Sequence, residues 1–167
     1  MPKCLICDSE YRPFVDFGEM PIANAFATKE EMNNEYTFPM KVGFCESCNM
    51  VQLVEQPDRE KMFHDNYAFF SSTSNYMQEH FKQFAHSVSN LQNLDKKSFV
   101  VEIGCNDGVL LKPLSKLGIK CIGVDPATNV IKSLINAENF TIINDFFSEQ
   151  LATTLKVKHG KVDAILS

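Results

Sequence analysis

From Ser98 onward, short apolar runs alternate with amphipathic segments along the chain. The apolar runs are rich in valine, isoleucine and phenylalanine, and they predict strands at residues 99–103, 119–124, 141–143 and 162–166. The segments between them predict helices at residues 108–117, 127–136 and 148–155. Strands alternating with helices in this order predict an α/β domain with a parallel sheet and right-handed crossovers.

Residues 59–95 predict helices with a break at the polar run 71–75, whose serine, threonine and asparagine residues are good N-caps. The second helix is strongly amphipathic. Its apolar stripe consists of Met77, Phe81, Phe84, Ala85, Val88 and Leu91. We expect this stripe to pack on the α/β domain.

Residues 1–58 carry two cysteine pairs, several prolines and only short apolar stretches. So short a segment rarely buries enough apolar area to offset the conformational entropy of ordering it. We therefore expect a metal ion or a neighbouring domain to stabilise this module.

The cysteines of this module form two C-x-x-C pairs, Cys4 with Cys7 and Cys45 with Cys48, with 37 residues between the pairs. Two such turns supply the four thiolates of a tetrahedral Zn²⁺ site. Four cysteine ligands leave no open coordination position, so the ion is expected to hold the fold and not to perform chemistry. A redox pair is the alternative, but it usually opens a helix in a βαβ unit, and neither pair has that setting. The two remaining cysteines are expected to be packing residues.

Charge and composition exclude several classes of function. The formal net charge is −5 and the pI is near 5.4, so the chain has no excess of basic residues with which to bind nucleic acid or an anionic membrane. The chain has no run of 18 apolar residues and no secretory signal pattern. We expect a cytoplasmic protein without membrane or nucleic-acid partners.

The sequence from Phe99 to Gly108 runs from a predicted strand through a glycine-containing turn into a helix. Glycines at 104 and 108 let the backbone approach a ligand closely, and the helix N-terminus presents free N–H groups. Asp125 ends the next predicted strand, where a carboxylate can accept hydrogen bonds from ribose hydroxyls. A nucleotide-like ligand is therefore indicated, although the same pattern also occurs in α/β proteins of other kinds.

The turn departs from the G-x-G-x-x-G pattern of nicotinamide-binding proteins, so an NAD-dependent oxidoreductase is a weaker alternative. With Glu102 before Gly104 and Gly108, the turn is similar to the E-x-G-x-x-x-G turn of class I methyltransferases. By the same resemblance, Asp145 at the end of the third strand occupies the position that contacts the adenine.

Five motifs, in order along essentially the whole chain, resemble those of the sugar-nucleotide C-methyltransferase family. They are Cys4-x-x-Cys7, Gly18-x-x-Pro21-x-Ala23-Asn24, Cys45-x-x-Cys48-x-x-Val51-Gln-Leu53, Tyr67-Ala-Phe-Phe-Ser-Ser72 and Glu102-Ile-Gly-Cys-Asn-Asp-Gly108. The resemblance implies a zinc-binding module at 1–58, a helical linker and cofactor cap at 59–95, and a truncated Rossmann-like domain at 96–167. It implies Zn²⁺ and S-adenosylmethionine as cofactors. The residues expected at the S-adenosylmethionine site are Tyr67, Ser72, Glu102, Gly104, Asn106, Gly108, Asp125 and Asp145.

Members of that family place a methyl group on C3 of a nucleotide-linked 4-keto-deoxy sugar. The resemblance puts their acid and base residues after the fourth strand of the methyltransferase domain, beyond these 167 residues, so methyl transfer by this chain alone is not expected. The apolar strand at 162–166 is expected to promote self-association or to pair with a complementing chain. Two alternatives stay open: a zinc-ribbon interaction module on an α/β scaffold, and a purely structural role for Tyr67, Ser71 and Ser72 as a helix cap with an aromatic core residue.

Overall fold

The computed structural model describes residues 1–23, 26–63, 66–134 and 140–167, which form two compact units, Met1–Phe63 and His64–Ser167. Five residues of the sequence predictions lie outside the described ranges: Asn24 of the second motif, residues 64 and 65 of the helical segment expected at 59–95, and the last two residues of the helix expected at 127–136.

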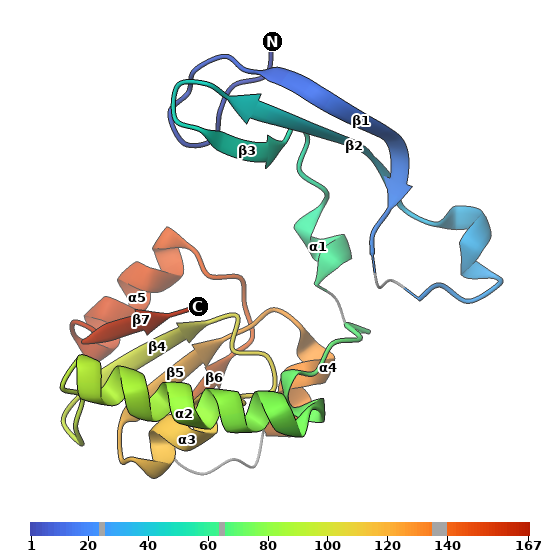
Figure 1. Ribbon diagram of the computed structural model, residues 1–167. Coiled ribbons are helices and arrows are strands. Elements are labelled where there is room, and N and C mark those ends of the chain that lie inside the picture. Colours follow the sequence, from blue (N-terminus) through green and yellow to red (C-terminus); the bar gives the residue numbers. More distant parts are fainter. Residues whose placement is uncertain (24–25, 64–65, 135–139) are drawn as a thin grey trace. The chain divides into compact units, whose positions relative to one another are not determined.

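The first unit is built on a three-stranded antiparallel sheet in the order β1-β2-β3 (Figure 1). Its elements are β1 (Arg12–Pro21), a 3-10 helix (Glu31–Asn34), β2 (Thr37–Cys45), β3 (Met50–Leu53) and the short helix α1 (Arg59–Met62). Among the described residues of this unit, the buried cluster consists of Cys4, Tyr11 and Cys45, with Cys48 and Val54 packed against it. A core of this size agrees with the expectation that the unit needs a metal ion.

The second unit is a four-stranded parallel sheet in the order β6-β5-β4-β7. Its strands are β4 (Phe99–Ile103), β5 (Lys120–Val124), β6 (Phe140–Ile143) and β7 (Ala164–Leu166), and its helices are α2 (Asn75–Leu91), α3 (Leu111–Lys116), α4 (Thr128–Ile131) and α5 (Glu149–His159). Two 3-10 helices, Ser71–Thr73 and Lys132–Leu134, complete the unit. The predicted α/β fold with a parallel sheet is confirmed.

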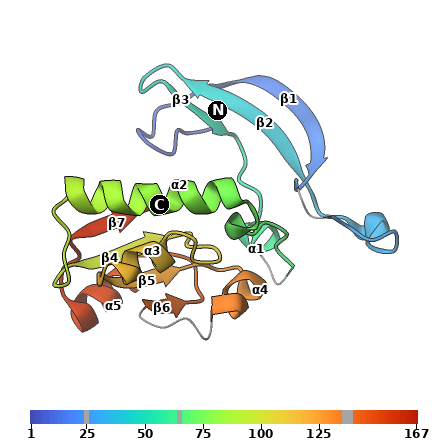
Figure 2. The same ribbon diagram turned by 60° about the horizontal axis from the view of Figure 1, so that its bottom comes forward.

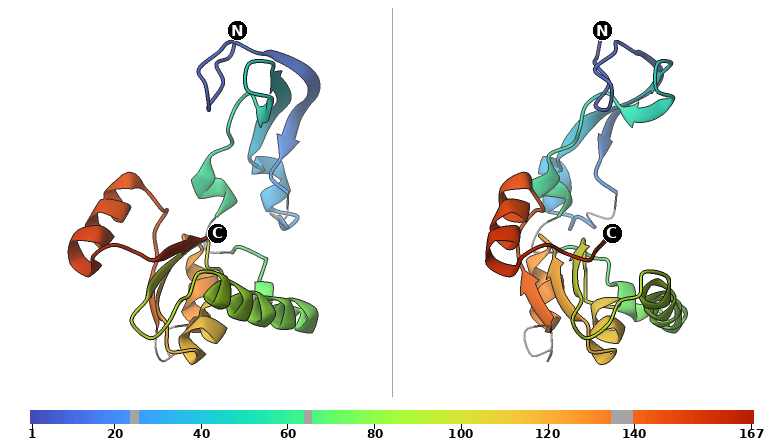
Figure 3. Two further views of the ribbon diagram at one scale, coloured as in Figure 1. Left: turned by 60° about the vertical axis from the view of Figure 1, so that its left-hand side comes forward. Right: turned by 90° about the vertical axis from the view of Figure 1, so that its left-hand side faces the viewer.

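Helices cover both faces of this sheet, as Figures 2 and 3 show. On one face, Val100 of β4 packs with Ala85 of α2 and with Leu111 and Leu114 of α3. On the other face, Val101 of β4 belongs to a core that includes Leu155 of α5. Because successive residues of a strand point to opposite faces, the apolar run of β4 serves both cores.

The order of the strands places a topological switch at β4. The chain runs outward from β4 to β5 and β6 on one side, and then returns through α5 to β7 on the other side of β4. Ligands of open α/β sheets bind beyond the carboxyl ends of the strands at such a switch. The turn that follows β4 is therefore the position that the fold favours for a ligand.

The sequence placed some helices inaccurately. Residues 66–70 were expected to be helical, but they are turn or non-regular, and the helix expected at 108–117 spans only Leu111–Lys116. Hydrogen bonds from side chains distant in sequence fix residues 66–70. The later helix begins only at Leu111 because several residues before it, the last of them Gly108, have positive φ.

The amphipathic stripe of α2 was predicted in part. Helix α2 begins at its predicted cap, where the Ser74 hydroxyl accepts a hydrogen bond from the Met77 N–H, and Phe81, Ala85 and Val88 pack on the core. Phe84 and Leu91 were expected in this stripe but are exposed, and Ser89 is buried in their place. The Ser89 hydroxyl donates a 2.7 Å hydrogen bond to the carbonyl of Ala85, so its burial leaves the hydroxyl paired.

Within the described part of the chain, no helix has the length and apolar character that crossing a membrane requires.

Candidate metal centre and cofactor site

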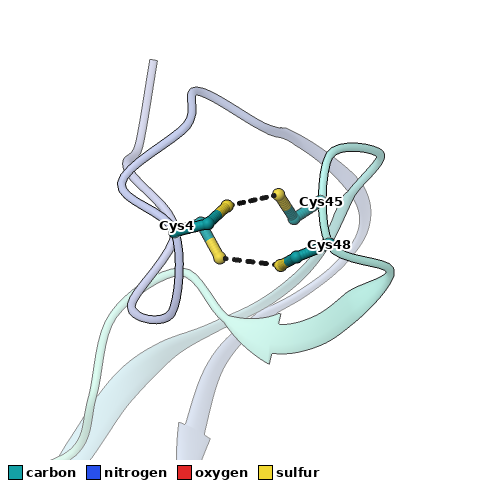
Figure 4. Close-up of side chains that lie close together, drawn as sticks. Cys4, Cys45 and Cys48 are labelled. Atoms are coloured by element: carbon teal, nitrogen blue, oxygen red, sulfur yellow. Dashed lines mark hydrogen bonds between the residues drawn. The ribbon is translucent and has the colours of Figure 1, made fainter.

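The two C-x-x-C pairs form equivalent turns. Cys4 and Cys7 are followed by Asp8, and Cys45 and Cys48 by Asn49; the following residue has positive φ in both turns (58° and 60°). Its N–H donates to the carbonyl of the first cysteine, at 2.9 Å for Asp8 and 2.8 Å for Asn49. Aspartate and asparagine tolerate this left-handed backbone better than most residues. Each turn thereby presents two sulfur atoms to the other (Figure 4).

The four sulfur atoms lie within 4.8 Å of one another. The Sγ atoms of Cys4 and Cys48 are 3.6 Å apart, and so are those of Cys7 and Cys45, which is too long for a disulfide bond. A tetrahedral Zn²⁺ site with Zn–S bonds of about 2.3 Å separates its sulfur atoms by about 3.8 Å. The donor set and the spacing therefore fit a structural zinc ion.

The surroundings of the sulfur atoms favour thiolates at one end of the cluster. Backbone N–H groups of Cys7 and Ile6 lower the pKa of the Cys4 thiol to about 6. Burial raises the pKa of Cys48 to about 12. Because Zn²⁺ binds thiolates, the ion offsets the cost of ionising Cys48.

The turn after β4 has three residues in left-handed backbone. Gly104, Asn106 and Gly108 have φ values of 71°, 48° and 69°. The space that a Cβ atom would occupy at Gly104 contains no atom within 4 Å, so the backbone is open to a ligand there. Asn106 takes up the positive φ that is easiest for glycine, and asparagine is among the residues that tolerate it.

Asp125 follows β5 directly and closes this turn from the neighbouring strand. Its Oδ2 atom accepts a hydrogen bond from the Asn106 N–H at 2.8 Å, and its Oδ1 atom accepts one from the Ala127 N–H at 2.9 Å. The side-chain amide of Asn144 donates to the Asp125 carbonyl at 3.0 Å. Asp125 therefore shapes the turn through its side chain, and each of its oxygens keeps a further lone pair for a ligand.

Glu102 lies in the middle of the core, in β4, and is 6% exposed. Burial, together with the nearby carboxylates of Asp125 and Asp107, raises its pKa to about 8. Its Oε2 atom is buried and has no hydrogen-bond partner among the residues that the structure describes. A buried, incompletely paired carboxyl group beside two carboxylates is suited to a ligand that carries positive charge, because that charge favours the ionised form of Glu102.

Asn106 fastens the segment 67–72 to this turn. Its Oδ1 atom accepts a hydrogen bond from the Ser71 N–H at 2.9 Å, and its Nδ2 atom donates one to the Phe69 carbonyl at 3.1 Å. Both ends of the amide are therefore bonded to the segment. These contacts explain why the segment is not helical.

Two further side chains reach the same segment, and sequence reasoning did not identify either of them. The Asp107 Oδ2 atom accepts a hydrogen bond from the Ser72 N–H at 2.9 Å, and the Asn129 Nδ2 atom donates one to the Tyr67 carbonyl at 2.8 Å. Asp107 stands inside the glycine turn, so the motif itself could have indicated it. Asn129 contacts a residue 62 positions away, and no local pattern indicates that contact.

The remaining predicted residues differ in their surroundings. Tyr67 and Ser72 are half-buried beside the turn after β4. Asp145 is exposed two residues beyond β6, and its Oδ1 atom accepts a hydrogen bond from the N–H of Phe146 at 2.7 Å. The structure thus brings Glu102, Asn106 and Asp125 together, and it leaves Asp145 at the rim of the same edge of the sheet.

Comparison with known proteins agrees with both sites. Residues 4–63 match a family model described as "Putative zinc binding domain", and residues 74–167 match one described as "Methyltransferase domain". The second match covers more than half of the chain, and the chain therefore belongs to the methyltransferase family. Its cofactors are S-adenosylmethionine, for the α/β unit, and Zn²⁺, for the four-cysteine cluster.

Two curated relatives are similar to this chain. The C-methyltransferase NovU of Streptomyces niveus is 25% identical over 160 residues, which cover 95% of this chain and 38% of that protein. A ubiquinone biosynthesis O-methyltransferase of Rhodopseudomonas palustris (strain BisB18) is 36% identical over 67 residues, which cover 40% of this chain and 25% of that protein. The chain thus spans well under half the length of either relative.

Two solved structures also resemble the chain. A SAM-dependent methyltransferase from Archaeoglobus fulgidus is 25% identical, with a TM-score of 0.37, and the match covers 46% of this chain and 33% of that one. The plantazolicin methyltransferase BpumL, solved in complex with SAH, is 23% identical, with a TM-score of 0.35, and the match covers 41% of this chain and 31% of that one.

Proposed function

We propose that these 167 residues supply the methyl-donor site of an S-adenosylmethionine-dependent C-methyltransferase that acts on a nucleotide-linked 4-keto-deoxy sugar. The observation that carries the proposal is the turn after β4, which lies at the topological switch of the sheet and is surrounded by the buried carboxyl groups of Glu102, Asp107 and Asp125. The positive charge of a sulfonium ligand with an α-ammonium group complements the carboxylates of Asp107 and Asp125 and favours the ionised form of Glu102.

The choice of a keto sugar is supported by the five motifs and by the similarity to NovU over 95% of this chain. A ketone makes the neighbouring carbon acidic, so a general base can remove a proton from it. The resulting carbanion forms a new carbon–carbon bond with the methyl group as the bond from that methyl to sulfur breaks. We propose that the residues which move this proton lie outside the 167 residues described here.

We assign roles to individual residues from their positions around the turn after β4 and at the carboxyl edge of the sheet. The open backbone at Gly104 admits the amino-acid part of the methyl donor, and Asp125 accepts hydrogen bonds from the ribose hydroxyls. The exposed carboxylate of Asp145 accepts a hydrogen bond from the adenine amino group, as the family resemblance implies.

Calorimetric titration of the zinc-loaded protein with S-adenosylmethionine tests the proposal. We expect saturable binding, no binding of NAD, and weaker binding by Asp125→Asn, which can still accept one of the two backbone hydrogen bonds. Glu149→Gln, which changes an exposed carboxyl group at the start of α5, is the matched control and should bind normally. Failure of the folded, zinc-loaded protein to bind S-adenosylmethionine would contradict the proposal, as would equal binding of NAD.

A further inference from the structure

The side chains of Asp107 and Asn129 make a similar pattern of hydrogen bonds, and the proposed function assigns neither residue a hydrogen bond to the ligand. In each, one side-chain atom is bonded to the backbone of the segment 67–72. In each, the other polar atom of the side chain, Oδ1, is buried and has no hydrogen-bond partner within the described ranges. The two residues belong to different parts of the fold, Asp107 to the turn after β4 and Asn129 to helix α4 after β5, so the arrangement arises twice independently.

A buried oxygen without a hydrogen bond is costly, and native structures rarely keep one without a reason. Asp107 is only 3% exposed, so water does not readily satisfy its free oxygen. Both Oδ1 atoms are acceptors, and the missing partner must therefore be a donor. A ligand with an ammonium group and with hydroxyl or amino groups provides donors of this kind.

We propose that Asp107 and Asn129 each hold the segment 67–72 with one atom and the bound methyl donor with the other, and that they thereby couple ligand binding to the order of this segment. The inference rests on the proposed function. Asp107, in the turn after β4, accepts a hydrogen bond from the α-ammonium group. Asn129, four residues after Asp125, accepts one from the nucleoside.

Asn106 has a different part in the same arrangement. The oxygen and the nitrogen of its side-chain amide are both bonded to the segment, so Asn106 is a positioning residue. The free oxygens of Asp107 and Asn129 are enclosed, so the segment must shift for a ligand to reach them. The Ser71 and Ser72 N–H groups, which donate to the turn, report on that movement through their hydrogen exchange.

The test compares two ligands that differ in the amino-acid part. S-adenosylhomocysteine carries the α-ammonium group, and 5′-methylthioadenosine lacks it. We expect Asp107→Asn to lower the affinity for S-adenosylhomocysteine by about tenfold to a hundredfold, as is usual for the loss of a charged hydrogen bond, and to leave the affinity for methylthioadenosine unchanged. Asn129→Ala should lower the affinity for both ligands.

Hydrogen exchange supplies the second measurement. In the unaltered chain, S-adenosylhomocysteine should slow exchange at the Ser71 and Ser72 amides, and this effect should be smaller in both variants. Asp95→Asn is the matched control: its carboxylate also accepts a backbone hydrogen bond, from the Lys97 N–H at 2.7 Å, but it lies away from the carboxyl ends of the strands. This variant should leave affinity and protection unchanged.

The outcomes separate the two proposals. If the unaltered chain binds neither nucleoside, the proposed function and this inference both fail. If it binds S-adenosylhomocysteine and folded Asp107→Asn binds equally well, the inference alone is overturned. An equal loss of affinity for both ligands in Asp107→Asn would refute the ammonium contact. Should Asp107→Asn not fold, normal ligand affinity and normal protection of Ser71 and Ser72 in Asn129→Ala would overturn the coupling.

Discussion

The carboxylate of Asp125 accepts a hydrogen bond from the backbone N–H of Asn106 at 2.8 Å, so a residue at the end of β5 fixes the turn that follows β4. Asp125 was expected only as a ligand for ribose. Its second oxygen is also bonded to a backbone N–H, that of Ala127. The residue therefore contributes to the fold as well as to the site.

Replacement of Asp125 by alanine should lower stability even without ligand. Two backbone N–H groups lose a charged acceptor, and we expect the free energy of unfolding to fall by about 1–3 kcal/mol. Urea denaturation followed by circular dichroism measures the change. Asp145→Ala, which removes an exposed carboxylate, should change the midpoint little, and equal effects of the two substitutions would contradict this assignment.

The raised pKa of Glu102 predicts a pH dependence of stability. In the folded chain this carboxyl holds its proton up to a pKa of about 8, whereas in the unfolded chain it ionises near its ordinary value of 4.5. Between these values the folded state binds more protons, so the contribution of this group to stability is greatest below pH 4.5, falls as pH rises, and levels off above pH 8.

Glu102→Gln removes this dependence and isolates the effect. The stability of the unaltered chain relative to the variant should decrease from pH 5 to pH 8, with a slope of up to about 1.4 kcal/mol for each pH unit. Denaturant midpoints measured for both proteins over this range provide the comparison. Parallel pH profiles of the two proteins would mean that Glu102 ionises normally.

Zinc removal should unfold the first unit and spare the second. The cysteine cluster is the main buried cluster of Met1–Phe63, whereas His64–Ser167 has its own cores on both faces of its sheet. We expect one bound zinc ion per chain, released by a strong chelator, with most of the helical circular dichroism retained. Cys45→Ser should abolish zinc binding, and Cys121→Ala, at a buried cysteine outside the cluster, should bind the ion normally. Complete loss of helical signal on chelation would contradict the separation of the units.

Among the strands that the structure describes, β7 pairs with β4 alone and lies at one edge of the sheet, and its Ile165 side chain is 57% exposed. An apolar edge strand of this kind pairs readily with another chain. We expect concentration-dependent self-association in light scattering, and Ile165→Lys should reduce it. Val157→Lys, at an exposed apolar position on α5, serves as the control and should have little effect. A monomer at high concentration would argue against edge pairing.

The sequence allowed good prediction of features that depend on local pattern. Strand β4 has the bounds that its apolar run predicted, because Phe99 to Glu102 are buried between the two layers of helices and Ile103 is half-buried. The four cysteines lie together as their spacing indicated. Both features follow from residue patterns only a few positions long, which a single sequence displays.

Features that depend on distant contacts were harder to predict. The sequence favoured a helix through residues 66–70, but Asn106 and Asn129 bind this segment from positions more than 30 residues away. Ser89 is buried on α2 because its hydroxyl can bond the preceding turn, whereas the larger Leu91 is exposed. Hydrophobic periodicity contains no information on either outcome.

The two strands that pair with β4 are β5 and β7. Their separations from β4 along the sequence are very different. Phe99 pairs with Lys120 of β5, while the bond from the Phe99 N–H to Asp163 beside β7 spans 64 residues. Closing a longer loop costs more entropy, and contacts of high sequence separation slow folding. We therefore expect β4, β5 and β6 to assemble first and β7 to join last, so that the proposed ligand site, which follows the first three strands, forms before the sheet gains its last strand.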